Sequence, residues 1–247
     1  MKTKHCPSLI FIVFVFVSLL STVIKVNAIN TRFSTEELTE KYQSVFISNI
    51  NISSLASEPA KKIIHCFDVN EKGMIAIGSN SNGQEQICIY SSEGVFLYGY
   101  NFDCSGDFCV EWYNDHLNIC LIRSDVIITV DKNANIIEMA GIQDTIDNNT
   151  LFNRFMYSTN RNIKNNEYIL KNNMGILNAF ATGYSQISIK DVENIETVVY
   201  EVDFIERIKA VIIPILVIFS CLLAVFCVLI WNRYHNLRYN RQSAKLP

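Results

Sequence analysis

The chain has 247 residues and a formal net charge of −3, and its charges are distributed very unevenly. Residues 29–206 hold all 24 Asp and Glu but only 12 Lys and Arg, a formal charge of −12. An acidic segment without a basic stripe interleaved with aromatic residues argues against nucleic-acid binding. About 180 residues are enough for one domain with its own core.

Residues 1–28 have the parts of a secretory signal peptide. Lys2 and Lys4 precede an apolar run from Leu9 to Val23, and Val26-Asn27-Ala28 follows at the expected cleavage site. This pattern predicts export with cleavage after Ala28. The alternative is an uncleaved signal anchor with both chain ends inside the cell, and either arrangement exports the middle of the chain.

Residues 29–62 are a polar lead-in, in which one short helix is expected. Its signals are a capping residue, Ser34, two acids soon after it, and apolar residues at helical spacing, Leu38, Tyr42 and Phe46. From Ile63 the apolar residues alternate with period two, which predicts a β-rich exported domain over residues 63–206. Short strands are expected at 75–77, 87–90 and 95–98, with turns at Gly73, 81–83 and 91–94.

A sequence repeat runs through this domain at an offset of 40 to 42 residues. Segments 67–69, 75–77 and 87–98 align with 108–110, 117–119 and 127–139, and a further hairpin at 187–200 resembles 87–98 at an offset of 100. A period near forty with four short strands is typical of a β-propeller blade. At this period the exported segment holds at most four blades. An antiparallel meander or sandwich of similar hairpins is the alternative.

The segment Asp68-x-x-x-x-Gly73-x-Ile75-x-Ile77 resembles the Asp…Gly-hydrophobic segment of β-propeller blades of the NHL type. The resemblance implies a propeller-like or partial propeller fold. A partial array has unpaired strand edges, which the lead-in or a partner chain is expected to cover. The segments Cys66-Phe67-Asp68-Val69-Asn70 and Ile169-Leu170-Lys171-Asn172 also resemble exported, membrane-anchored proteins of low-GC bacteria, a likeness that implies no activity.

The Asn-rich residues 142–166 are expected to form a loop. A strand is expected at 167–170, and either a strand or a short helix at 174–181. Residues 201–209 then form a short polar stem in front of the membrane.

Five cysteines lie in the exported part, which in an oxidising compartment allows up to two disulfides. Cys104 and Cys109 form the best local pair, because Ser-Gly-Asp between them can turn the chain. The alternative is that all five cysteines are small buried residues.

No sequence motif indicates catalysis, a cofactor or a metal site. The calcium-loop-like starts at Asp68 and Asp131 lack needed ligands. Carboxylates and a histidine between Asp103 and His116 could serve an enzyme of unrecognised type, but such neighbours are common in an acidic domain. Four aromatic residues between the repeats either pack between sheets or form a binding face: Tyr98, Tyr100, Trp112 and Tyr113.

Residues 208–231 are predicted to be a transmembrane helix, because Ala210 to Trp231 carries no charge and is long enough to span a bilayer. The tail 232–247 contains four basic residues and no acidic one. Basic flanks stay in the cytoplasm, so the sequence predicts a type I single-pass protein of the cell membrane with its acidic domain outside.

The expected function is binding of a partner protein or a surface ligand by the anchored β domain. The alternatives are an accessory subunit of a membrane complex, in which the helix makes the contacts, and an extracytoplasmic enzyme with its site between Asp103 and His116.

Overall fold

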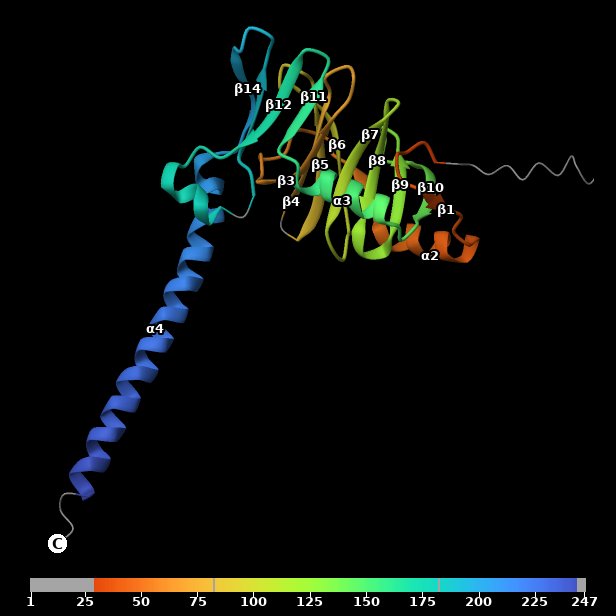
Figure 1. The fold of residues 1–247 in the computed structure, drawn as a ribbon. Coiled ribbons are helices and arrows are strands. Elements are labelled where there is room, and N and C mark those ends of the chain that lie inside the picture. The colour runs from red at the N-terminus through yellow and green to blue at the C-terminus, as the bar shows by residue number, and fades with distance from the viewer. Residues whose placement is uncertain (1–28, 82, 182, 244–247) are drawn as a thin grey trace, which may run out of the picture.

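The structure is a computed structural model that describes residues 29–81, 83–181 and 183–243. Three antiparallel sheets follow one another along the chain and stand side by side, and a long helix leaves from the last of them (Figure 1). The prediction of a mostly β domain followed by one apolar C-terminal helix is therefore confirmed. The predicted signal peptide lies outside the described residues.

Each sheet is built on a four-stranded meander with its strands in chain order. The first contains β3 (Ile64–Val69), β4 (Ile75–Ser81), β5 (Gln84–Tyr90) and β6 (Phe96–Phe102). The second contains β7 (Phe108–Tyr113), β8 (His116–Leu121), β9 (Val126–Val130) and β10 (Ile136–Ile142), with the 3-10 turn η1 (Ile122–Ser124) between β8 and β9. The third contains β11 (Asn160–Ile163), β12 (Asn166–Lys171), β13 (Gln186–Lys190) and β14 (Glu196–Glu201).

The last hairpin of each meander closes with the same kind of turn. A side-chain oxygen of Ser91, Asp131 or Asp191 accepts hydrogen bonds from the backbone N–H groups two and four residues later. The residue three positions later has a positive φ in every case, as in Gly94, Ala134 and Asn194. These turns are 40 and 100 residues apart, as the repeat predicts. The three sheets do not form a closed propeller, so the NHL-type resemblance stays a prediction.

The lead-in covers the outer edges of the first two sheets. Strand β1 (Thr35–Glu36) pairs with β10, and β2 (Ser53–Ser54) pairs with β6. Helix α2 (Glu40–Ile50) lies between them, capped by Thr39, whose hydroxyl accepts a hydrogen bond from the N–H of Tyr42. The predicted helix is thus confirmed but starts later than Ser34, because Thr35 and Glu36 are used as a strand. In the described part of the chain, no lead-in strand pairs with the outer edge of β14.

Two hydrophobic clusters hold the sheets together, one on each face of the first sheet. Between the first and second sheets, the rings of Phe102 and Phe108 meet edge to face at 5.1 Å. Between the first and third sheets, Tyr90 and Tyr200 meet at 5.3 Å. Strands β4 and β5 are therefore buried on both faces over most of their length, which explains the uninterrupted apolar runs 75–77 in β4 and 87–90 in β5.

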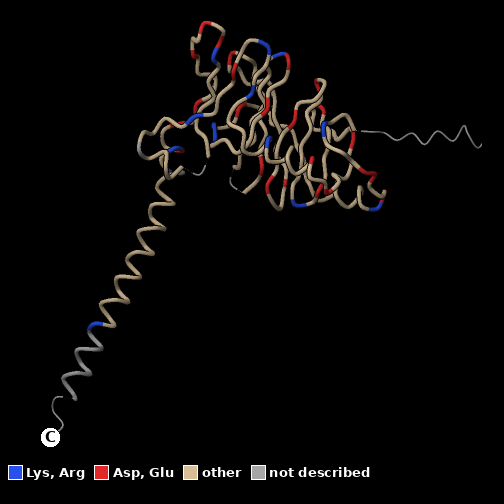
Figure 2. Tube along the Cα trace, viewed as in Figure 1, with Lys and Arg blue, Asp and Glu red and all other residues tan. Residues whose placement is uncertain are grey.

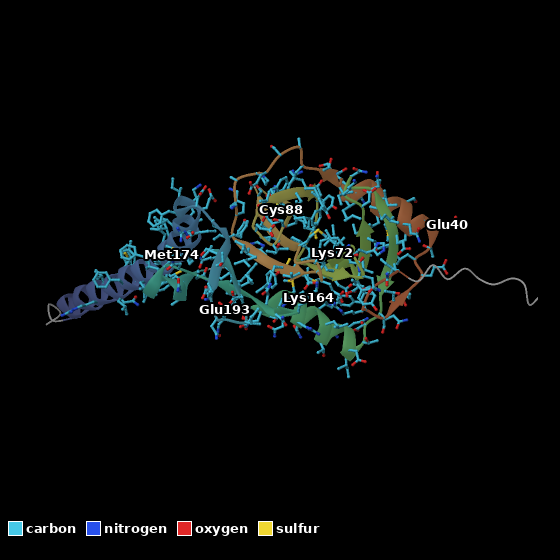
Figure 3. The ribbon with its side chains drawn as sticks, turned by 90° about the horizontal axis from the view of Figure 1, so that it is seen from above. Glu40, Lys72, Cys88, Lys164, Met174 and Glu193 are labelled. Carbon is cyan, nitrogen blue, oxygen red and sulfur yellow. The ribbon has the colours of Figure 1, made fainter. Side chains whose placement is uncertain are left out.

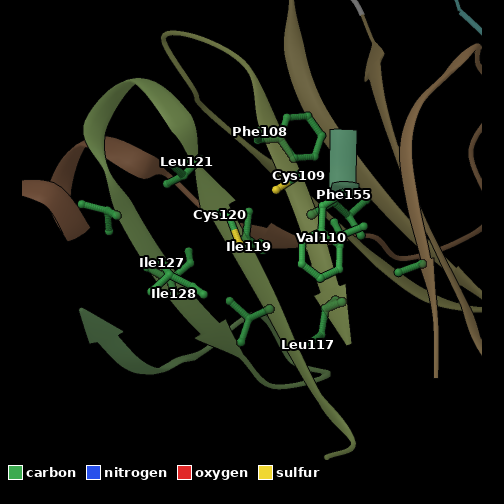
Figure 4. Packing of buried hydrophobic residues seen from close by; sticks show 14 of the residues in the cluster. Phe108, Cys109, Val110, Leu117, Ile119, Cys120, Leu121, Ile127, Ile128 and Phe155 are labelled. Carbon is green, nitrogen blue, oxygen red and sulfur yellow. The ribbon is translucent and has the colours of Figure 1, made fainter. Parts of the chain in front are cut away.

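Residues 146–157 form helix α3 (Ile146–Tyr157) and not the expected loop. Thr145 caps the helix, and the buried amide of Asn148 binds the backbone of Ser34 and Gln143. At the other end of α3, Phe155 is only 1% exposed and packs into the cluster of the second sheet (Figure 4). Tertiary packing thus outweighs the low helix propensity of the asparagines.

One buried ion pair connects the first strands of all three sheets. Arg161 of β11 donates a hydrogen bond to a carboxylate oxygen of Asp68 of β3 at 3.0 Å, and the other oxygen accepts one from the N–H of Trp112 of β7 at 2.7 Å. Both charged side chains are at most 7% exposed. Burial raises the pKa of the Asp68 carboxyl, against the opposing effects of the Trp112 amide and the guanidinium.

Candidate binding groove

Helix α2 presents apolar side chains to solvent. Tyr42 and Val45 are 43% and 53% exposed and lie three positions apart on one face, whereas Ile50 is 3% exposed. Ile47 is 49% exposed on the other side of the helix. Phe46, one turn after Tyr42, is half-buried, and the two rings stack at 6.2 Å. A helix that packs on a core normally turns this kind of side chain inward, so the face of α2 that carries Tyr42 and Val45 is available for another molecule.

A hollow of about 480 Å³ lies beside this face. Its volume falls within the range of about 300–1,000 Å³ that is usual for small-ligand sites. The α2 side is lined mainly by Tyr42, Val45, Phe46 and Asn49, and the opposite side by Asp103, Cys104, Ser105 and Leu121. We call this hollow the α2 groove. Figure 3 places Glu40 of α2 and Met174, near the start of the C-terminal helix, at opposite ends of the domain.

The α2 groove has a carboxylate fixed at its rim. One oxygen of Asp103 accepts a hydrogen bond from the side-chain amide of Asn51 at 2.8 Å, and the other accepts one from Gln84 at 3.2 Å. Among the described residues, no lysine or arginine forms a salt bridge with Asp103. Neutral amides orient the carboxylate without cancelling its charge.

A second carboxylate lies close to the groove. Burial raises the pKa of the half-buried Cys104 thiol that lines the groove, against the opposing effect of its hydrogen bond to Gly106, and the nearby negative charges of Glu85 and Asp107 raise it further. One carboxylate oxygen of Glu85 is buried without a hydrogen-bond partner among the described residues. The groove therefore combines apolar walls with a negative potential, which favours a ligand that carries an apolar group beside a cationic one.

The four aromatic residues of the expected binding face do not share an exposed surface. Trp112 is 3% exposed, and Tyr100 is fully buried with its hydroxyl donating a hydrogen bond to the carbonyl of Asp131 at 2.8 Å. Tyr98 and Tyr113 are half-buried. The side chains of a strand alternate between its two faces, and in this three-sheet arrangement both faces are covered. Packing between sheets, the alternative that the sequence leaves open, is what the structure contains.

The thiols of Cys104 and Cys109 are both free in the structure. Cys104 donates a hydrogen bond to the carbonyl of Gly106, whereas Cys109 is fully buried on β7 and lies directly opposite Cys120 of β8 (Figure 4). The Cys104–Cys109 disulfide thus stays a prediction, and the register offers Cys120 as the nearer partner of Cys109.

The carboxylates and the histidine between Asp103 and His116 do not converge. Asp103 and Asp107 precede β7, whereas Asp115 lies at its far end in the tight turn to β8, and His116 is the first residue of β8. A strand of six residues separates its ends by about 17 Å, too far for two groups to act on one substrate atom. Asp115 instead pairs with Lys72 at 2.6 Å on the surface.

The sequence does not predict the α2 groove, although the spacing of Tyr42 and Phe46 predicts the helix that forms one side of it. The groove needs residues more than fifty positions apart, which no local pattern brings together. Comparison of the chain with protein-family models, curated proteins and solved structures finds no match, so no ligand can be transferred from a relative.

Proposed function

We propose that this chain is a single-pass membrane protein whose exported β domain recognises a partner protein through the α2 groove. The groove is the observation that carries the proposal, because it combines exposed apolar side chains with a fixed carboxylate whose charge is not paired. The proposed ligand is a segment of a partner protein that places an apolar side chain in the groove and a lysine or arginine beside Asp103.

Helix α4 (Phe204–Ser243) supports the membrane part of the proposal. Its segment Phe204–Arg233 is long and apolar enough to cross a bilayer, and 18 consecutive residues within it have a mean hydropathy of 3.1. The sequence has no charged residue between Lys209 and Arg233, and Figure 2 shows α4 as an uncharged stretch over most of its described length. The positive-inside rule then supports a cytoplasmic tail and an exported β domain at the cell membrane.

The test is co-purification of the full-length protein from native membranes after mild crosslinking. Val45→Lys removes an apolar side chain from the groove and adds a positive charge that repels the proposed lysine or arginine, at a site that is 53% exposed, so the fold tolerates it. Val95→Lys, on the turn between β5 and β6, is the matched control at 60% exposure. The proposal expects one partner with the wild type and Val95→Lys and none with Val45→Lys. A partner that Val45→Lys retains refutes the groove.

An accessory subunit that binds through its helix is the second candidate. Leu222 and Phe226 are 63% and 59% exposed on α4, and such side chains can face another helix as well as lipid. Replacing residues 210–231 with an unrelated apolar helix separates the two functions. The groove proposal expects the partner to remain after this replacement, and the accessory-subunit function expects its loss.

A further inference from the structure

A second apolar surface lies where the β domain meets α4. The 3-10 helix η2 (Gly175–Phe180) lies in a connection between β12 and β13. From Asn172 to Ile189 the sequence contains no charged residue, although 18% of the whole chain is charged. Leu177 and Phe180 are 41% and 38% exposed on η2. An uncharged loop that exposes large apolar groups is unusual on the water-facing surface of a protein.

Helix η2 packs against the beginning of α4 (Figure 1). One face of α4 is covered there: Val211 is 2% exposed, and Pro214 and Ile215 are half-buried. On the other face, Ile212 and Ile213 are 47% and 62% exposed. The covered residues recur three and four positions apart, as expected for one side of a helix that lies against η2.

The covered face lies within the uncharged part of α4. Lys209 is the last charged residue before Arg233. Ile215 follows Lys209 by six residues, which is about 9 Å along the helix axis. If Lys209 lies at the membrane surface, η2 covers α4 at the boundary between lipid headgroups and acyl chains. The apolar faces of interfacial segments lie about 5–10 Å deep at this boundary.

We propose that η2 is a second membrane contact, which inserts Leu177 and Phe180 into the outer leaflet beside α4. The occupant of this surface is the lipid bilayer, because the surface continues the apolar surface of the membrane helix and carries no charge. The inference rests on the proposed function only in requiring that α4 cross the membrane.

Ion pairs fix the start of α4 to the domain at the same place. Arg207 pairs with Glu201 of β14 at 3.0 Å, and Lys62 of the lead-in pairs with Glu206 at 3.3 Å. These pairs hold the first turns of α4 against the domain, and two adjacent membrane contacts define how the domain is tilted. This tilt sets the direction in which the α2 groove faces.

Tryptophan quenching by brominated lipid tests the contact in the full-length protein, reconstituted in phosphatidylcholine vesicles. In a Trp231→Phe background, Trp112 is the remaining native tryptophan, and it is buried in the domain. Leu177→Trp and Phe180→Trp report on η2. Val192→Trp, on the exposed β13–β14 turn of the same sheet, is the water-facing control, and Leu222→Trp reports on α4.

The expected result is loss of emission for both η2 variants in vesicles brominated near the headgroups, and for Leu222→Trp in vesicles brominated near the ends of the acyl chains, with Val192→Trp unchanged in both. Quenching at Leu222→Trp without quenching at either η2 variant overturns the contact and leaves the membrane helix in place. Blue-shifted but unquenched emission from η2 also overturns it, since a protein then covers the surface. Absence of quenching at Leu222→Trp refutes the membrane helix itself. A far-ultraviolet circular dichroism spectrum equal to that of the Trp231→Phe background shows that each variant is folded, and the emission of that background is subtracted as the Trp112 contribution.

Discussion

Replacing Arg161 with methionine removes the group that connects the first strands of the three sheets. The guanidinium binds the Asp68 carboxylate at 3.0 Å and the carbonyl of Phe67 at 3.0 Å, and it lies 4.8 Å from the Phe67 ring centre. Arg161→Met leaves Asp68 as a buried charge without its cation. Removal of one partner of a buried ion pair costs about 3–5 kcal/mol, so we expect a loss of about 4 kcal/mol in the free energy of unfolding.

The same replacement in an Asp68→Asn background is expected to cost about 2 kcal/mol, because no unpaired carboxylate remains and only hydrogen bonds are lost. The coupling between the two positions is then about 2 kcal/mol. Urea unfolding of the full-length protein in detergent micelles measures it, with Trp112 fluorescence as the signal in a Trp231→Phe background. Arg123→Met is the control, since Arg123 is exposed and makes one bond, to the carbonyl of Ser105.

Equal costs of Arg161→Met with Asp68 in place and in the Asp68→Asn background would refute this reasoning, because the penalty would then come from lost packing and not from the buried charge. A cost below about 1 kcal/mol in both backgrounds would show that the pair does not connect the sheets energetically.

Three further predictions follow from buried polar groups. Asn148→Ala removes three hydrogen bonds from a side-chain amide that is 1% exposed, and we expect it to lower the free energy of urea unfolding by about 3 kcal/mol. The same replacement of the exposed neighbour, Asn149→Ala, is expected to change this free energy by less than about 0.5 kcal/mol. Equal effects of the two replacements would contradict a stabilising role of the Asn148 hydrogen bonds. Burial raises the pKa of five tyrosines in the folded protein above their unfolded value of about 10. Their contribution to the free energy of unfolding is therefore complete below about pH 10 and decreases as the pH rises above this value. They are Tyr90, Tyr98, Tyr100, Tyr168 and Tyr200. The absorbance change that accompanies ionisation of these tyrosines is expected only when the protein unfolds at alkaline pH. Reversible ionisation of all tyrosines in the folded protein would contradict this prediction. Burial also raises the pKa of Cys88 to about 12 and that of Cys66 and Cys120 well above the usual value, so of the five thiols from Cys66 to Cys120 only Cys104 is expected to react with a thiol reagent at pH 8 before unfolding. An unreactive Cys104 in a protein lighter by two hydrogens would instead place Cys104 in a disulfide, and peptide mapping would show whether Cys109 is its partner.

The features that sequence analysis predicted correctly are local ones. The hairpins at 87–98 and 187–200 were recognisable because each turn is made by a side chain that caps backbone groups two and four residues away. The apolar run of α4 likewise needs no distant partner. Helix α3 was missed because its stability comes from Phe155 and Asn148, which contact the second sheet and the lead-in.

The candidate site could not be predicted in the same way. In the sequence, Asp68 belongs to the NHL-like Asp…Gly segment and to a calcium-loop-like start, and neither pattern indicates its partner Arg161, which is 93 residues away. Trp112 and Tyr100 are residue types that are common in binding faces, but the packing of the three sheets buries both. The α2 groove depends on a lead-in helix that lies against a loop more than fifty residues later, and only the fold brings these together.

Photo-crosslinking from the α2 groove tests the central claim most directly. A photoreactive amino acid is placed at Val45 in the full-length protein in native membranes, with the same group at Val95 as the control for general surface contacts. Recognition through the groove predicts one discrete adduct from position 45, absent from position 95 and lost when Asp103 is replaced by asparagine. The same adducts from both positions, or an adduct from position 45 that persists without the Asp103 carboxylate, would contradict it.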